Sequence, residues 1–444
     1  MINTVNQGES SASLAATLDQ SQQNLIARDS DLFFHQQLST PVANTISKVE
    51  GAYIYDGEGR KYLDLHGNGV HTVGYNNPFV LKAIANSIET GLTFAPRRFT
   101  NEPAVQLAEK LKQITPVGLD KVLFCPGGSE AIEMAIMLAK RHTNTWKTLS
   151  FEGAFHGSGF QAVTIGADPH FHEGLGPLMP GAIHLEMPDF YRNPWGFDDE
   201  EKVYDHYFTL FKTLVENNED IAAFISEPIF YTSSVPTKNY WEQVQTLCKQ
   251  HGILMIFDEI YTAFGRTGKM FACEHFVTPD ILVYGKGFGG GVVPFAGIIG
   301  RDDLNTMPDR SIGHFTHEKS PFCASVSQAV IDYIIAHDLV KKTEELGMYF
   351  KSGLEELQQA FDFIGNIQGL GLNLAVDLVE DRNTKARAYA QAQSLVQYAF
   401  QEGISLKLIQ GNILSLKPAL VIEKNEIDDV LKVLKHGFEI ISRK

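Results

Sequence analysis

Short apolar stretches without polar interruption alternate with helical patterns through the middle of this 444-residue chain. They are KVLF (121–124), IAAFIS (221–226), ILMIF (253–257) and ILVY (281–284). A strand carries such an unbroken apolar run when both of its faces are buried. Strands that alternate with helices favour a mainly parallel sheet sandwiched by helices. The sequence therefore predicts an α/β fold, whose sites lie at the carboxyl ends of the strands.

The helical segments carry start and stop signals. Residues 102–114 form one predicted helix, and Asn101 and Pro103 are suited to begin it. Its predicted apolar face comprises Val105, Leu107, Ala108, Leu111 and Ile114. A second helix is predicted to end at Gly252, and a long amphipathic helix follows at 341–361. The last predicted helix has Asn425 as its N-cap.

We expect two lobes, because the chain is too long for one small core. The large domain is predicted to span residues 76–324 and to hold the parallel sheet. A small α+β domain is predicted from both chain ends, combining residues 325–444 with a strand pattern inside 1–75. The opening segment MINTVNQGESSASLAATLDQSQQN is polar and Ser/Gln-rich, so we expect it to be a loose arm.

Charge and composition narrow the class of protein. Lys and Arg total 37 against 53 Asp and Glu, a formal charge of −16, so a broad nucleic-acid surface is not expected. The four cysteines lack C-x-x-C spacing, which predicts neither a disulfide framework nor a zinc cage. The start of the chain does not resemble a secretory signal, and no apolar run has the length of a membrane span. A cytoplasmic enzyme is therefore expected.

Three polar features follow predicted strands. The turn PGGSEA (126–131) leads into a helix, so the backbone N–H groups of Gly128 and Ser129 are suited to hold a phosphate. The alternative is a tight turn that needs glycine only for steric reasons. G-x-x-x-x-G-K-[ST] is absent, so no nucleotide P-loop is predicted.

The other two features are Asp258, directly after ILMIF, and Lys286, between two glycines after ILVY. A strand-end aspartate is otherwise often just a cap, but a buried carboxylate needs a cationic or N–H partner. A lysine in a low-dielectric setting has a lowered pKa, and a neutral amine bonds to aldehydes. A phosphate turn, a buried carboxylate and such a lysine together meet the needs of pyridoxal 5′-phosphate.

The block FDEIYTAFGRTGKMFACEHFVTPDILVYGKGFGGGVVPFAG (257–297) closely resembles the signature of the class III aminotransferases. The resemblance extends from GAYIYDGEGRKYLDL (51–65) to LKPALVIEKNEIDDVL (416–431). It implies the fold type I architecture of pyridoxal-phosphate enzymes. Lys286 is then implied to bind the aldehyde, and Asp258 to keep the pyridine nitrogen protonated.

The resemblance implies further site residues. Phe155 corresponds to the aromatic ring that stacks on the cofactor, and Glu227 to a supporting carboxylate. Thr316 corresponds to a threonine that reaches the phosphate of the partner protomer's cofactor, which implies a homodimer with shared active sites. Pro126 and Gly127 depart from the family's usual phosphate turn.

Other departures concern the substrate. Family members that use 2-oxoglutarate have a glutamate and an arginine that alternate between pairing with each other and binding substrate. This chain has Thr232 at the glutamate position and Ser415 at the arginine position. The joint loss is physically reasonable, because the loss of one charge alone would leave the other charge without a partner. Tyr261 also replaces the glutamine usually found beside the phenolic oxygen of the cofactor.

New cations accompany these losses. PRRFTNEP contains Arg97 and Arg98, and HFTHEKSP adds His317 and Lys319 beside Thr316. Arginine suits phosphate-like oxyanions, although surface ion pairs are the alternative. The two segments resemble a subgroup that includes ammonia-lyases acting on (R)-1-hydroxy-2-aminoethylphosphonate. Arg97 and Arg98 are therefore predicted substrate contacts.

The resemblance leaves three functions open. The first is a lyase that releases ammonia and phosphonoacetaldehyde from one small anionic amine. The second is an ω-transaminase that needs a keto acid, and the third is a cofactor-binding homologue without activity. The histidine and glutamate residues at 170–173 and 314–318 lack H-E-x-x-H spacing, so no metal site is predicted.

Overall fold

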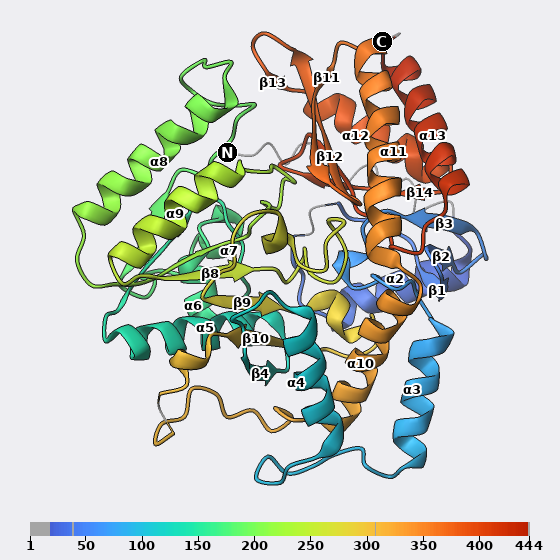
Figure 1. Ribbon diagram of the computed structural model, residues 1–444. Coiled ribbons are helices and arrows are strands. Elements are labelled where there is room, and N and C mark those ends of the chain that lie inside the picture. Colours follow the sequence, from blue (N-terminus) through green and yellow to red (C-terminus); the bar gives the residue numbers. More distant parts are fainter. Residues whose placement is uncertain (1–17, 38–39, 307, 443–444) are drawn as a thin grey trace.

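A seven-stranded sheet forms the centre of the computed structural model, which describes residues 18–37, 40–306 and 308–442 (Figure 1). The strand order is β4-β10-β9-β8-β7-β5-β6. The strands are β4 (Lys121–Cys125), β5 (Lys147–Phe151), β6 (Ala182–Leu185), β7 (Ile221–Ser226), β8 (Leu254–Asp258), β9 (Ile281–Tyr284) and β10 (Ala296–Gly300). Only β10 runs antiparallel to its neighbours β4 and β9 within this sheet. The predicted α/β fold with a mainly parallel sheet is confirmed.

Both faces of this sheet are buried, which explains the unbroken apolar runs. Helix α5 (Gly128–Thr143) packs on one face, where Ile256 of β8 lies in its core. On the other face Phe257 packs edge-to-face against Trp241 of α9 (Lys238–Gln250), with ring centroids 5.0 Å apart. Successive side chains of one strand therefore enter two different cores.

The predicted helices are present, with two corrections. Helix α4 (Glu102–Ile114) begins where expected, because the Asn101 side chain accepts a hydrogen bond from the N–H of Ala104 at 3.1 Å. Val105 was wrongly assigned to its buried face, since this side chain is 40% exposed. Asn425 is not an N-cap, because α13 (Lys424–Ser442) begins one residue earlier.

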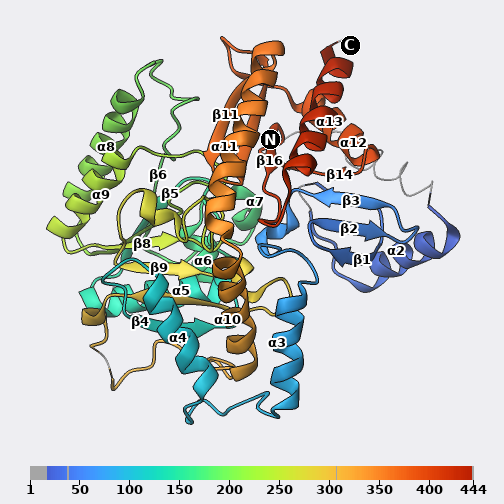
Figure 2. The ribbon, with the colours of Figure 1, turned by 45° about the vertical axis from the view of Figure 1, so that its right-hand side comes forward.

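Two smaller sheets flank the large one (Figure 2). One contains β1 (Ile46–Glu50), β2 (Tyr53–Asp56), β3 (Lys61–Asp64) and β14 (Ile404–Ser405). The other contains β11 (Ile364–Leu370), β12 (Asn373–Asp381), β16 (Ile413–Leu416) and β15 (Lys407–Ile409), with β13 (Ala386–Arg387) beside β12. The parallel pairing of β14 with β3 joins distant parts of the chain. The domain boundaries at 75 and 324 stay predictions.

The remaining helices surround these sheets (Figure 1). They are α2 (Gln20–Leu32), α3 (Pro78–Glu89), α6 (Phe160–Ile165), α7 (Pro169–His172), α8 (Glu200–Glu216), α10 (Pro321–Ala336), α11 (Leu339–Ala360) and α12 (Tyr389–Gln401). The predicted N-terminal arm lies largely outside the described residues, which begin at residue 18. Among the residues that the structure describes, no helix combines the length and the apolar character needed to cross a bilayer.

Candidate active site

Three chemically important side chains lie at the carboxyl ends of parallel strands in the large sheet. Strands β7, β8 and β9 are parallel neighbours, so their carboxyl ends open on the same side. Glu227 directly follows β7, Asp258 is the last residue of β8, and Lys286 stands two residues beyond β9. The charges of both carboxylates act on the Lys286 ammonium, which places the three groups in one site.

The surroundings of Lys286 explain the glycine that follows it. Lys286 has φ 45°, in the left-handed region that residues with a Cβ rarely adopt. A Cβ on Gly287 would lie 2.1 Å from Oγ1 of Thr72, so a larger residue would not fit there. Burial lowers the pKa of Lys286, and the charges of Asp258 and Glu227 oppose this shift. The site therefore favours a larger neutral fraction of this amine than water does.

Asp258 is held by two hydrogen bonds and is only 5% exposed. Its Oδ2 accepts from Nδ1 of His156 at 2.8 Å, and its Oδ1 accepts from the backbone N–H of Ile260 at 3.1 Å. His156 is also buried, and its Nε2 has no partner among the described residues. The carboxylate is thus fixed in orientation at the end of its strand. His156 was not singled out from the sequence, although it directly follows Phe155.

The predicted phosphate turn forms the start of helix α5. Gly127 is the N-cap in extended conformation, and no side chain of the described residues caps the first N–H groups of the helix. The Ser129 hydroxyl accepts a hydrogen bond from the N–H of Ser158 at 2.9 Å. A Cβ on Gly128 would lie 2.9 Å from Cδ1 of Ile260, so glycine also brings this turn close to the residues that follow β8. The turn has the uncapped N–H groups that an anion requires.

The residues implied by family resemblance lie in different surroundings. Phe155 is 37% exposed and stands against Phe171, with ring centroids 4.4 Å apart. Glu227 accepts a hydrogen bond at Oε2 from the N–H of Tyr231 at 2.9 Å. Burial raises the pKa of Glu227 to about 7, and the nearby Asp258 charge adds to the shift. Thr316 lies in an exposed turn.

The paired arginines do not lie free at the end of the sheet. Nε of Arg97 is 3.0 Å from Oε2 of Glu318, whose side chain is buried. Arg98 is exposed, and its guanidinium lies 5.4 Å from the centroid of the Phe99 ring. The ion pair connects the segment that contains Arg97 and Arg98 to the turn that contains Thr316. Arg97 and Arg98 as substrate contacts stay predictions.

Two further lysines enter the site, and neither was singled out from the sequence. The ammonium groups of Lys286 and Lys417 each lie 4.6 Å from the centroid of the Tyr261 ring. Burial lowers the pKa of Lys407, and the Lys286 charge lowers it further. Lys417 interrupts the apolar run ILSLKPALVI, and this lone cation was the available sequence signal.

The two positions that the family resemblance assigns to the paired charges are both buried. Ser415 lies inside β16 and is 1% exposed. The backbone carbonyl of Thr232 accepts a hydrogen bond from Nε2 of Gln368 at 2.8 Å. Neither position supplies a charged side chain to the site.

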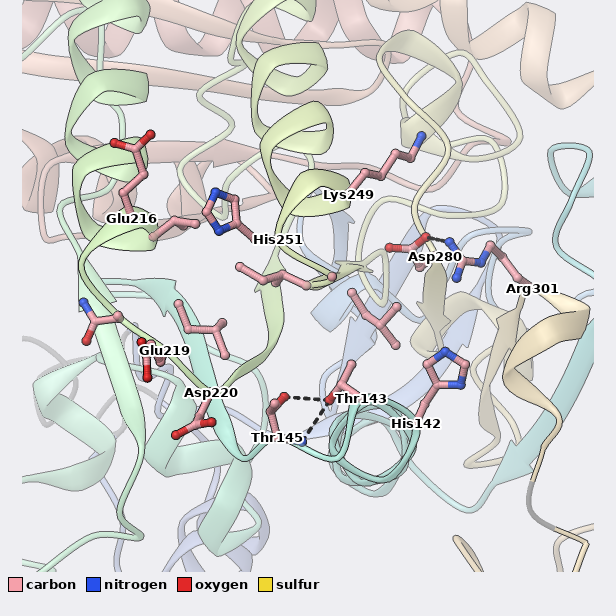
Figure 3. Close-up of a pocket in the computed structure, with 16 residues that line it drawn as sticks. His142, Thr143, Thr145, Glu216, Glu219, Asp220, Lys249, His251, Asp280 and Arg301 are labelled. Carbon is pink, nitrogen blue, oxygen red and sulfur yellow. Dashed lines mark hydrogen bonds and ion pairs between the residues drawn. The ribbon is translucent and has the colours of Figure 1, made fainter.

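A hollow of about 620 Å³ lies at the amino ends of the parallel strands (Figure 3). It is lined by residues that precede the parallel strands, including Asp220 before β7 and Gly252 before β8. Asp280 and Arg301 form an ion pair beside it. Active sites of such sheets lie at the carboxyl ends of the strands, so this hollow is separate from the site around Lys286.

Comparison with known protein families identifies the chain. The model of the class-III aminotransferases matches residues 34–438. The chain belongs to the class-III aminotransferase family. Enzymes of this family depend on pyridoxal 5′-phosphate, so the predicted cofactor is confirmed.

Its relatives catalyse several reactions. The chain is 39% identical to "(R)-1-hydroxy-2-aminoethylphosphonate ammonia-lyase" of Vibrio splendidus, over 94% of this chain and 90% of that protein. It is 35% identical to "Leucine/methionine racemase" of Thermococcus litoralis, over 94% and 95% of the two chains. A solved (S)-enantioselective omega-transaminase from Thermomicrobium roseum has a TM-score of 0.87 and 27% identity, over 96% of this chain and 99% of the other. These similarities confirm the fold type I architecture and leave the substrate open.

The residues at the carboxyl edge fit the cofactor. An amine, a buried carboxylate and an uncapped helix start provide partners for an aldehyde, a pyridinium nitrogen and a phosphate. The Tyr261 hydroxyl is buried and has no hydrogen-bond partner among the described residues. A buried hydroxyl without a partner is costly, so it is suited to a polar atom of a bound group.

Proposed function

We propose that this enzyme is an ammonia-lyase that acts on a small β-hydroxy amine carrying an anionic group. The best candidate is (R)-1-hydroxy-2-aminoethylphosphonate, which would give phosphonoacetaldehyde and ammonia. The substrate loses water across its two carbons, and a water molecule then replaces nitrogen, so that the net products are the aldehyde and ammonia. The 39% identity to a relative named for this reaction supports the choice.

The joint loss of two charges is the observation that carries this proposal. Thr232 and Ser415 are buried and uncharged where relatives that use 2-oxoglutarate have a glutamate and an arginine. A carboxylate-bearing second substrate would lose its charged partner at this position. A lyase needs no such second substrate, so the missing pair is compatible with a reaction on one amine.

Lys286 is proposed as the group that binds the cofactor's aldehyde and then moves the proton. With cofactor and substrate bound, Nζ of Lys286 would accept the proton from the amine-bearing carbon. The lowered pKa of Lys286 favours the neutral amine that can accept this proton. The cofactor, when bound, supplies an electron sink for the carbon that loses the proton.

Asp258 is proposed to keep the pyridine nitrogen protonated. Its carboxylate receives hydrogen bonds from His156 and the N–H of Ile260, which keep it oriented toward one position. We assign His156 a positioning role, because it acts through Asp258. Glu227, whose pKa is raised to about 7, is proposed as the neighbouring carboxylate that balances the cations of the site.

The cofactor's other parts require separate contacts. We propose that the N–H groups of Gly128 and Ser129 hold the phosphate, since the start of α5 is uncapped. Phe155 is proposed to stack on the ring, and its partly exposed side chain is available for that contact.

A homodimer is proposed as the active form. Thr316 is exposed, and the adjacent surface carries large apolar side chains that a second protomer would cover: Ile88, Leu92, Phe94 and Phe99. The rings of Phe94 and His317 are 5.2 Å apart, so the apolar segment contacts the threonine turn. Thr316 would then reach the phosphate of the partner's cofactor.

An assay without keto acid tests the reaction. The purified holoenzyme is incubated with (R)-1-hydroxy-2-aminoethylphosphonate alone, and free ammonia and phosphonoacetaldehyde are measured. The proposal predicts equal amounts of both over many turnovers. Turnover that depends strictly on pyruvate or 2-oxoglutarate would reject it.

The second candidate is an ω-transaminase, favoured by the similarity to the Thermomicrobium roseum enzyme. A transaminase would convert the cofactor to its amine form when an amine is added alone. A keto acid would then restore the original absorbance. This spectral cycle separates the two functions in the same preparation.

A further inference from the structure

Lys407 and Lys417 add positive charge beside Lys286. Strand β15 pairs antiparallel with β16, and Lys407 lies directly opposite Ser415. Directly opposed residues of an antiparallel pair project from the same face. Lys417 is two residues beyond Ser415, so an extended chain turns it to that face as well. The two lysines therefore flank the position where the family has its arginine.

The described residues provide few direct partners for these ammonium groups. Lys417 is 3% exposed and donates one hydrogen bond, to the carbonyl of Tyr231 at 3.0 Å. Within the described part of the chain, Lys407 has no hydrogen-bond partner at Nζ, and neither lysine forms an ion pair with a carboxylate. Burial lowers the pKa of both lysines. The Glu227 charge opposes this shift for Lys417, while the charges of Arg266, Lys286 and Lys407 add to it. An anion from outside the chain would offset the loss of hydration of the two lysines.

We propose that Lys407 and Lys417 bind the anionic group of the substrate and make the site selective for a tetrahedral dianion over a carboxylate. This inference rests on the proposed function and identifies the residues behind its substrate class. It also explains how a site without the family's arginine can hold an anionic amine.

The chemistry of the two lysines favours a phosphonate. An arginine fork matches the two coplanar oxygens of a carboxylate, whereas each lysine is a compact point charge with three donors. Two separate ammonium groups are suited to a group with three oxygens and up to two negative charges. A carboxylate has one negative charge and two oxygens, so it would leave one lysine poorly compensated.

Calorimetric titration of the holoenzyme tests this inference. The filled cofactor site prevents the probe from binding at the phosphate turn. Methylphosphonate and acetate are titrated into the wild type and into the variants Lys407→Met and Lys417→Met. The wild type should bind methylphosphonate more tightly than acetate. Each variant should lose about tenfold or more in methylphosphonate affinity, as expected for one charged hydrogen bond, and much less in acetate affinity.

Lys249→Met is the matched control, because it removes a lysine at the far edge of the sheet. It should bind methylphosphonate as the wild type does. Unchanged methylphosphonate affinity in both site variants, or no preference for methylphosphonate in the wild type, would overturn the inference. So would a Lys417→Met variant whose cofactor absorbance shifts while methylphosphonate affinity stays the same, since the lysine would then serve the cofactor.

The two proposals fail in different ways. Ammonia release with unchanged methylphosphonate affinity in the variants would leave the lyase function intact and refute the lysine site. Loss of methylphosphonate affinity in the variants, without ammonia release from the candidate substrate, would support the lysine site and refute the lyase function. Lys407 is only half-buried, so its variant keeps the test valid should Lys417→Met fail to fold.

Discussion

Replacing Lys417 with methionine should stabilise the enzyme at neutral pH. Methionine has a similar length and no charge, so it removes a buried ammonium without leaving a large cavity. Burial is the main cause that lowers the pKa of Lys417 from 10.5 to about 7. The unfolded chain therefore binds this proton more tightly than the folded enzyme does.

The pKa difference sets the size of the effect. A shift from 10.5 to about 7 corresponds to about 5 kcal/mol of folding free energy. This cost is fully present below about pH 7 and disappears as the pH rises toward 10.5, because the unfolded chain then also loses the proton. The variant also loses the hydrogen bond to the Tyr231 carbonyl, which is worth about 1.5–3 kcal/mol for a charged donor. The net gain should be about 2–3.5 kcal/mol at neutral pH.

Thermal unfolding of the cofactor-saturated enzyme from about pH 6 to about pH 10 measures this gain. The variant should melt several degrees above the wild type at the lower pH values, and the difference should vanish or reverse near pH 10. Lys249→Met should follow the wild type at every pH. A Lys417→Met variant that is less stable than the wild type at neutral pH would show that the folded protein already compensates this ammonium, which would refute the reasoning.

Further variants separate the proposed roles. Lys286→Ala should abolish turnover, as measured by ammonia release, while cofactor content by absorbance persists; normal turnover would contradict its role. Asp258→Asn should lower kcat by about 10- to 100-fold, as expected when one charged hydrogen bond to the cofactor is lost; an unchanged kcat would count against the pyridinium contact. Arg97→Ala and Arg98→Ala should raise KM and leave kcat unchanged, with a binding loss of about 1.5–3 kcal/mol for each arginine that contacts the anion. Unaltered kinetics in both would leave these arginines with structural roles.

The sequence predicted the large sheet because its strands are buried on both faces. Ile256 and Phe257 are neighbours that enter separate cores, so both must be apolar and the run is unbroken. A polar residue that ends such a run stands out, which is why Asp258 and Lys286 were found. The antiparallel insertion of β10 between β4 and β9 depends on long-range pairing, and no local pattern predicts it.

The errors at helix surfaces have local causes. Val105 lies at the margin of the apolar face of α4, where a periodic pattern does not distinguish contact from exposure. At α13 the Glu426 side chain accepts a hydrogen bond from the N–H of Glu423 at 2.8 Å. Asn425 therefore lies inside the first turn of the helix, one residue after its start.

The missed lysines show where sequence reasoning stopped. Lys407 is in a strand of three residues, too short for a periodic signal. The position of Lys407 opposite Ser415 is evident only from the pairing of β15 with β16. Lys417 was visible as a cation in an apolar segment, but its proximity to Lys286 depends on how Tyr261 packs between distant parts of the chain.

Three lysines around one site make the assignment of the covalent lysine the most direct test of the account. The holoenzyme is reduced with borohydride, digested and mapped by mass spectrometry for a pyridoxyl group. The account predicts this mass on Lys286 alone. A pyridoxyl group on Lys407 or Lys417, or none on any of the three, would contradict it.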